Sequence, residues 1–127
     1  MAPDVAIVGE VRDREAMPLL LTLSSGVTGY TTIHAGSARQ ALTRLRFVAQ
    51  LADTNQLAVA ALNNLVSEAI DLVVHAMRGP SGPRVMSIIA VEELTAGHDA
   101  VQFTTTELFS RSRYEAPLTR TGLLPLR

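Results

Sequence analysis

DVAIVGEVRD, residues 4–13, is the stretch of sequence that decides the fold. Val5 to Val8 form an unbroken apolar run rich in β-branched residues, and such a run predicts a strand covered on both faces, as in a parallel sheet. Gly9 and Glu10 follow directly. A carboxylate therefore follows directly after a strand that is expected to be buried. The rest of the sequence must show whether this carboxylate has a chemical role.

The residues after this strand predict an alternation of helices and strands. Residues 13–23 have helical composition with acidic residues early and Pro18 near the start, and Ser24-Ser25-Gly26 ends the helix. Ser37 followed three residues later by Gln40 is a capping-box pattern. The remaining patterns predict strands over 29–35, 71–77, 85–91 and 101–109, helices over 38–52 and 59–70, and turns at 78–83 and 95–99.

This order, β-α-β-α-α followed by three strands, predicts an α/β fold in which parallel strands are followed by an antiparallel edge hairpin. The chain of 127 residues is long enough for one domain with its own core. We assign residues 1–110 to that domain. Residues 111–127, which are polar and contain two prolines and a glycine, are expected to form a loose tail.

Composition excludes several kinds of chemistry. The chain has no cysteine, which removes disulfides and thiolate metal sites, and no pair of histidines has the helical spacing of a zinc site. All 11 basic residues are arginine, so a Walker A lysine, a Schiff base and a lysine general base are excluded within these residues. The net charge of −1 gives no indication of nucleic-acid binding, and no apolar run is long enough to span a bilayer.

Two strands end in reactive side chains. Glu10 follows the first strand, and His34 lies at the end of the second. Because ligands bind at the carboxyl ends of strands in open α/β sheets, we expect Glu10 and His34 to share one rim. A carboxylate and an imidazole placed together can orient a water molecule and respond to developing negative charge.

The segments around Glu10 and His34 resemble those of a known protein family. PDVAIVGEVRDREA, residues 3–16, followed by SGVTGYTTIHAGSARQALTRL, residues 25–45, is similar to the Walker B and His-box regions of secretion ATPases. These ATPases drive type II and type IV secretion, pilus assembly and conjugative transfer. The resemblance is strongest from Pro3 to about Val74, and it implies the C-terminal half of a RecA-like P-loop NTPase core.

The resemblance also implies roles for individual residues. Glu10 matches the Walker B glutamate that polarises the attacking water. His34 matches the His-box histidine that senses the nucleotide. The other positions that match the two motifs are Gly9 and Arg12 in the first, and Thr31 and Thr32 in the second.

Further expectations follow from the family. Its members are homohexameric rings that use ATP and Mg²⁺, lie in the cytoplasm at the inner-membrane face and act with secretion or pilus platform proteins. They carry a Walker A loop upstream of Walker B, and these 127 residues contain none. We therefore expect the chain alone to bind nucleotide weakly, to hydrolyse ATP poorly or not at all, and to associate with itself or with a companion chain that carries Walker A.

Other interpretations remain open. A non-catalytic interaction module that binds secretion-motor subunits is the main alternative, and a nonfunctional remnant is another. Taken alone, Glu10 would be a solvated carboxylate and His34 a surface histidine. We interpret His75 as a core or edge residue, His98 as part of a turn, and Arg39, Arg44 and Arg46 as a solvated helix face.

Overall fold

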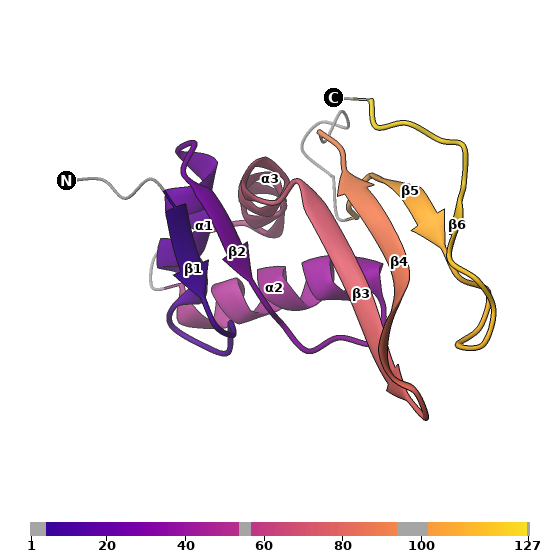
Figure 1. The fold of residues 1–127 in the computed structure, drawn as a ribbon. Helices are drawn as coiled ribbons and strands as arrows, with labels where there is room; N and C mark the ends of the chain where they lie inside the picture. The colour runs from indigo at the N-terminus through magenta and orange to yellow at the C-terminus, as the bar shows by residue number, and fades with distance from the viewer. Residues whose placement is uncertain (1–4, 54–56, 94–101, 127) are drawn as a thin grey trace.

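The computed structural model describes residues 5–53, 57–93 and 102–126. It is an α/β structure in which three helices cover one face of the strands (Figure 1). The opposite face of β1, β2 and β3 has no helix over it in the described part of the chain (Figure 1). The predicted α/β class, with parallel strands first and antiparallel strands after them, is confirmed.

The first two strands form a parallel pair. β1 (Val5–Val8) lies beside β2 (Thr28–Thr31), with Val8 opposite Thr31. β2 is shorter than the strand predicted over 29–35, but contact with the first segment continues past its end, because the amide of Val11 donates to the carbonyl oxygen of Thr32 at 2.9 Å. The segments that follow both strands therefore stay side by side.

The remaining strands form an antiparallel sheet in the order β3-β4-β5-β6. β3 (Leu72–Gly79) and β4 (Gly82–Val91) make the predicted hairpin, with a turn shorter than expected because both strands extend to Gly79 and Gly82. Gly82 has φ 92°, a left-handed conformation that glycine adopts without strain. The last two strands are β5 (Thr105–Ser110) and β6 (Thr119–Arg120).

Each helix begins for a local reason. α1 (Ala16–Ser24) starts three residues later than predicted, since residues 13–15 form a turn and Pro18 sits in the first helical turn, where its missing N–H is tolerated. α2 (Ala38–Ala52) has the predicted cap: the Ser37 hydroxyl accepts from the amide of Gln40 at 3.1 Å. α3 (Val59–Ala69) follows.

The core lies between the helices and the strands. It consists of buried aliphatic side chains from all three helices and from β4, together with Val11 and Phe103; the largest fully buried ones are Leu20, Leu42, Leu62, Val66 and Val91. Burying each such side chain stabilises the fold by about 1.5–3 kcal/mol. Val8 of β1 and Ile33, which follows β2, pack against this core, and they hold the ends of the two strands, and thereby the rim, against the helices.

Two expectations differ from the structure. The first strand was expected to be covered on both faces, yet Ile7 is 75% exposed and alternate residues of β1 face solvent. The tail was expected to be loose, yet β6 pairs with β5, and the hydroxyl of Tyr114 donates to the carbonyl of Gly82 at 2.7 Å. The tail is held because its tyrosine ring and short strand find partners in the hairpin and β5, which no local pattern reveals.

The turn predicted at 95–99, which includes His98, and residue 101 lie outside the described residues. The strand predicted over 101–109 begins later than expected, because residues 102–104 are irregular and β5 starts at Thr105. His75 lies in β3 and is half-buried, as expected for an edge position. No helix in the described ranges is both long and apolar enough to cross a membrane.

Candidate functional site

The carboxyl ends of β1 and β2 bring the two predicted reactive side chains together. Glu10 Oε1 lies 2.8 Å from His34 Nε2. The expectation that both residues share one rim is therefore confirmed. The parallel register causes this, because it places the residues after Val8 beside those after Thr31.

Backbone contacts hold the two segments in place. The Thr32 hydroxyl donates to the carbonyl oxygen of Gly9, and the amide of Val11 donates to the Thr32 carbonyl oxygen. Thr32 thus contacts both sides of Glu10. Thr32 therefore links the segment that carries His34 to the segment that carries Glu10. The sequence motif indicated only that Thr32 belongs to the same motif as His34.

Arg12 binds the second carboxylate oxygen of Glu10. Its guanidinium Nε forms an ion pair with Glu10 Oε2. The hydrogen bond from Arg12, followed by weaker attraction to Arg12 and His34, holds the pKa of Glu10 below its ordinary value, and the same pairing raises the pKa of Arg12. Glu10 is therefore ionised at neutral pH, with both oxygens engaged.

The three side chains differ in accessibility. The side chain of Glu10 is 23% exposed, whereas those of Arg12 and His34 are 79% and 85% exposed. The carboxylate is thus set back in the rim, and two groups that can carry positive charge stand in front of it. An anion approaching the rim would meet the arginine and the imidazole first.

Glu15 supports this arrangement and was not singled out from the sequence. Its Oε1 accepts from the amide of Arg12 at 2.7 Å, and this hydrogen bond lowers the pKa of Glu15. The spacing of three residues between Arg12 and Glu15, just before a helix, is the kind of local signal that could have identified it.

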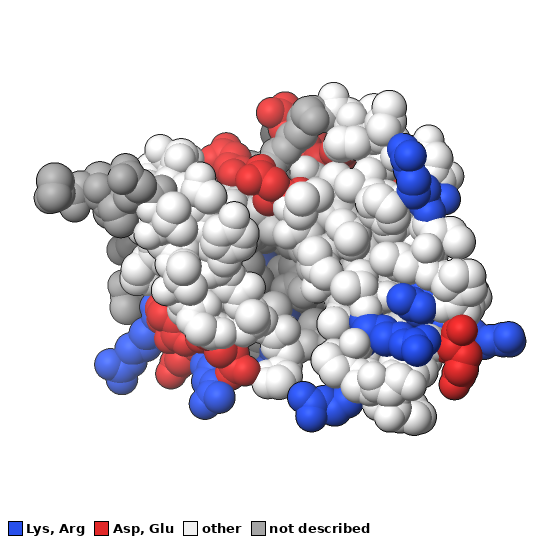
Figure 2. Space-filling view, viewed as in Figure 1, with Lys and Arg blue, Asp and Glu red and all other residues white. Residues whose placement is uncertain are grey.

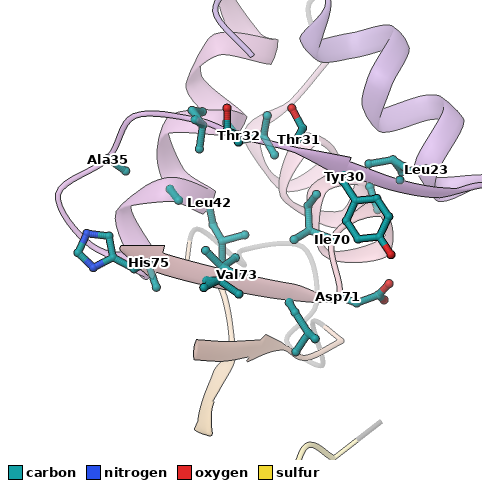
Figure 3. Close-up of a pocket in the computed structure, with 18 of the residues that line it drawn as sticks. Leu23, Tyr30, Thr31, Thr32, Ala35, Leu42, Ile70, Asp71, Val73 and His75 are labelled. Atoms are coloured by element: carbon teal, nitrogen blue, oxygen red, sulfur yellow. The ribbon is translucent and has the colours of Figure 1, made fainter. Parts of the chain in front are cut away.

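Thr31 lies in a different environment from Thr32. Its hydroxyl is buried and has no hydrogen-bond partner among the described residues. Thr31 and Thr32 both belong to the segment that lines a groove between β2 and β3, and their side chains are labelled in Figure 3. Among the described residues the Thr31 hydroxyl forms no hydrogen bond with the acid–imidazole pair. Arg12 contacts Glu10 directly, and Thr32 contacts the backbone of Gly9 beside it.

An α/β domain with an acid–imidazole pair at the carboxyl rim of its parallel strands has its reactive groups where such folds hold ligands. Residues 1–101 match the type II/IV secretion system protein family. The chain belongs to this family, as the resemblance predicted.

Two conjugal transfer proteins are similar to this chain in sequence. The chain is 37% identical over 103 residues to the probable conjugal transfer protein TrbB of Sinorhizobium fredii, covering 80% of this chain and 30% of that protein. It is 38% identical over 99 residues to the conjugal transfer protein TrbB of Rhizobium radiobacter, covering 77% and 29%. The chain thus spans less than a third of the length of these relatives.

A solved structure has a similar fold. The VirB11 ATPase of the Brucella suis type IV secretion system, crystallised with sulphate, superposes with a TM-score of 0.64 and 26% sequence identity. The match covers 69% of this chain and 28% of that ATPase. The α/β architecture is therefore that of part of a secretion ATPase.

Proposed function

We propose that this chain supplies the water-orienting and phosphate-sensing residues of an ATPase that powers type II or type IV secretion or conjugative transfer. The observation that carries the proposal is the 2.8 Å contact between Glu10 Oε1 and His34 Nε2 at the rim of two parallel strands. The similarity to TrbB proteins and to a VirB11 ATPase supports it.

In this proposal Glu10 is the catalytic residue. Its lowered pKa makes it a weak base, so it acts by accepting a hydrogen bond from water and aligning it, and not by storing a proton. His34 is exposed and reports on the terminal phosphate through its contact with the same carboxylate. Arg12 occupies one acceptor site of Glu10 Oε2, so a water molecule that binds this oxygen shares it with the guanidinium.

The residues present fit only one end of a Mg-ATP complex. The exposed imidazole and guanidinium suit a phosphate. Magnesium usually needs free carboxylate or hydroxyl oxygens in addition to substrate phosphates, and both oxygens of Glu10 are engaged. No group of three or more metal-ligating side chains occurs in the described ranges. The nucleotide and its metal would therefore be held mainly by residues beyond these.

The proposed ATPase needs parts other than this site. We infer that residues 1–110 act as the C-terminal half of a RecA-like domain, that a lysine-bearing phosphate loop comes from another polypeptide segment, and that the ring is a homohexamer in the cytoplasm, at the inner-membrane platform. The 127 residues contain no lysine, so on their own they should hydrolyse ATP poorly.

A non-catalytic interaction module is the second candidate. It is favoured by the apolar face that β1, β2 and β3 present to solvent, with Tyr30 66% exposed and Val74 57% exposed. Figure 2 shows that the middle of this face carries few charged side chains, which lie mostly at its margins. Such a face suits a protein partner whether or not the site turns over.

Reconstitution separates the two candidates. The chain is mixed with the N-terminal part of the Rhizobium radiobacter TrbB protein, up to the point where its similarity to this chain begins, and phosphate release from Mg-ATP is followed. We expect hydrolysis by the mixture and loss of about 100-fold or more with Glu10→Gln. Glu107→Gln, which removes an exposed carboxylate on β5, is the matched control and should leave the rate unchanged. Binding without hydrolysis would favour the interaction module.

A further inference from the structure

The imidazole of His34 reaches Glu10 although little packing holds it there. Its side chain is 85% exposed, yet Nε2 lies 2.8 Å from Glu10 Oε1. A hollow of about 400 Å³ opens beside it, lined by His34, Gln40 and other residues of α2. An exposed side chain with free space next to it can adopt other rotamers. The loop that carries His34 must therefore keep the imidazole near Glu10.

The start of this loop is fixed to the segment that carries Glu10. Figure 1 shows the loop crossing from the end of β2 to the start of α2. The Thr32 hydroxyl donates to the carbonyl oxygen of Gly9, and the Thr32 carbonyl oxygen accepts from the amide of Val11 at 2.9 Å. These contacts lie two residues before His34. The part of the loop after His34 has to be held from α2.

Gln40 holds the loop on that other side of His34. Its Oε1 accepts from the amide of Gly36, two residues after His34, at 3.0 Å. In the usual capping box the corresponding side chain binds the amide of the N-cap residue, which is Ser37 in this helix. Gln40 reaches one residue further back along the chain. Its hydrogen bond therefore restrains the loop and not only the end of the helix.

Residue 36 lies too close to the Gln40 amide group to carry a side chain without disturbing it. A Cβ at Gly36 would lie 2.6 Å from Gln40 Oε1. This distance is well below van der Waals contact, and the end of a glutamine side chain moves more easily than the backbone does. Gly36→Ala should therefore displace the amide oxygen and break the same hydrogen bond from the opposite side.

The turn of α2 that carries Gln40 is anchored to the rest of the molecule. Ala38 is 4% exposed and belongs to the core. The guanidinium of Arg39 donates to the carbonyl oxygen of Phe103 at 3.0 Å and to Thr105 Oγ1 at 3.2 Å. Phe103 is itself buried. The side chain of Gln40 therefore extends from a fixed turn, and its hydrogen bond can transmit that position to the loop.

We propose that Gln40 is a positioning residue, which holds the loop at Gly36 and thereby keeps the imidazole of His34 against the carboxylate of Glu10. Gln40 acts through the loop and not on the reacting atoms. Its effect on hydrolysis rests on the proposed function, whereas its effect on the contact between His34 and Glu10 does not. Loss of the hydrogen bond frees the imidazole to move into the hollow beside α2. A misplacement of about 1 Å at a catalytic group can lower a rate about 100-fold.

NMR of the folded chain measures the contact through the ¹⁵N chemical shift of His34 Nε2. Glu10→Ala removes the carboxylate and supplies the reference shift for a lost contact. Gln40→Met keeps the length and helix propensity of the side chain but loses its strong acceptor, whereas Gln40→Glu keeps an acceptor at the same distance. Thr43→Ala, at another exposed position of α2, is the matched control.

We expect Gln40→Met to move the His34 shift at least half of the way from the parent value to the Glu10→Ala value. Gln40→Glu and Thr43→Ala should both stay close to the parent. Gly36→Ala should move the shift as far as Gln40→Met does, and the two substitutions together should add nothing further. An unmoved shift in Gln40→Met, no rescue by Gln40→Glu, or an equal movement in Thr43→Ala would overturn the proposal. A parent shift equal to that of Glu10→Ala would also overturn it.

Phosphate release from the reconstituted mixture separates this inference from the proposed function. There Gln40→Met should lower kcat at least tenfold and leave KM within twofold, because it misplaces the imidazole while the nucleotide is bound mainly by other residues. Should the mixture fail to hydrolyse ATP while the NMR shifts behave as expected, the proposed function fails and the positioning role of Gln40 is supported. Hydrolysis with an unchanged kcat in Gln40→Met would contradict the positioning role and leave the proposed function intact.

Discussion

Glu10 and His34, which come from different strands, meet through a 2.8 Å contact between a carboxylate oxygen and Nε2 of the imidazole. The contact exists because β1 and β2 run parallel, so that the segments after Val8 and Thr31 emerge at the same rim. Arg12 holds the other carboxylate oxygen. The carboxylate of Glu10 thus contacts both Arg12 and His34, two groups that can bind an anion. Substitution of Arg12 therefore tests the electrostatics of the site.

Arg12→Ala should raise the pKa of Glu10 toward its ordinary value of 4.5, because the hydrogen bond from Arg12 is the largest cause of the lowering. The side-chain carboxyl shift of Glu10, followed by NMR from pH 2 to 7, measures this. A lowered pKa in the folded state means that the ionised form favours folding above about pH 4.5 and that this contribution is lost as the pH falls through the folded-state pKa. Stability of the variant should therefore depend less on pH in this range.

Arg14→Ala is the control, since this exposed arginine is not among the causes of the Glu10 shift. An unchanged Glu10 titration in Arg12→Ala would show that the ion pair is not formed in solution.

Ser37→Ala should lower the free energy of unfolding by about 1 kcal/mol, because the hydroxyl that accepts from the Gln40 amide at the start of α2 is removed. Urea denaturation followed by circular dichroism measures the change. Ser112→Ala, at an exposed bend, should stay within about 0.5 kcal/mol of the parent chain. Equal values for both variants would show that the cap contributes nothing.

Local sequence signals predicted most of the fold. The Ser37 cap, the apolar run of β1 and the hairpin of β3 and β4 all depend on neighbouring residues, and each was found. The meeting of Glu10 and His34 was predictable because it needs only two parallel strands in sequence order. The roles assigned to these residues stay predictions.

Features that depend on distant or absent partners could not be predicted. The exposure of Ile7 depends on which segments cover the sheet, and the groove beside Thr31 depends on which strand lies next to β2. The contact of Tyr114 with the hairpin joins residues far apart in sequence that carry no shared periodicity.

Tyr114→Phe should lower the free energy of unfolding by about 1 kcal/mol. The hydroxyl accepts from the amide of Ser81 at 2.9 Å and donates to the carbonyl of Gly82 at 2.7 Å, and both bonds are lost. Tyr30→Phe removes a hydroxyl from a tyrosine that is 66% exposed and should change stability by less than about 0.5 kcal/mol. Urea denaturation of the two variants, side by side, checks the difference.

The Tyr114 ring also explains why residue 79 is glycine. A Cβ at Gly79 would lie 2.4 Å from the ring. Gly79→Ala should therefore destabilise the parent chain more than it destabilises a Tyr114→Ala background, and additive effects would contradict this packing.

Ile7→Ser should weaken self-association of the chain, because Ile7 is 75% exposed on the apolar face of β1 and β2. Sedimentation velocity over a range of concentrations measures it, and we expect the shift toward larger species to need about tenfold more protein. Leu51→Ser is the matched control: Leu51 is 70% exposed on α2, in the helical layer and away from the open sheet face. Both variants should keep the stability of the parent within about 0.5 kcal/mol, since neither side chain is buried. An equal effect of the two substitutions would mean that association does not use the open sheet face, and a monomeric parent at every concentration would mean that this face needs a different protein to cover it.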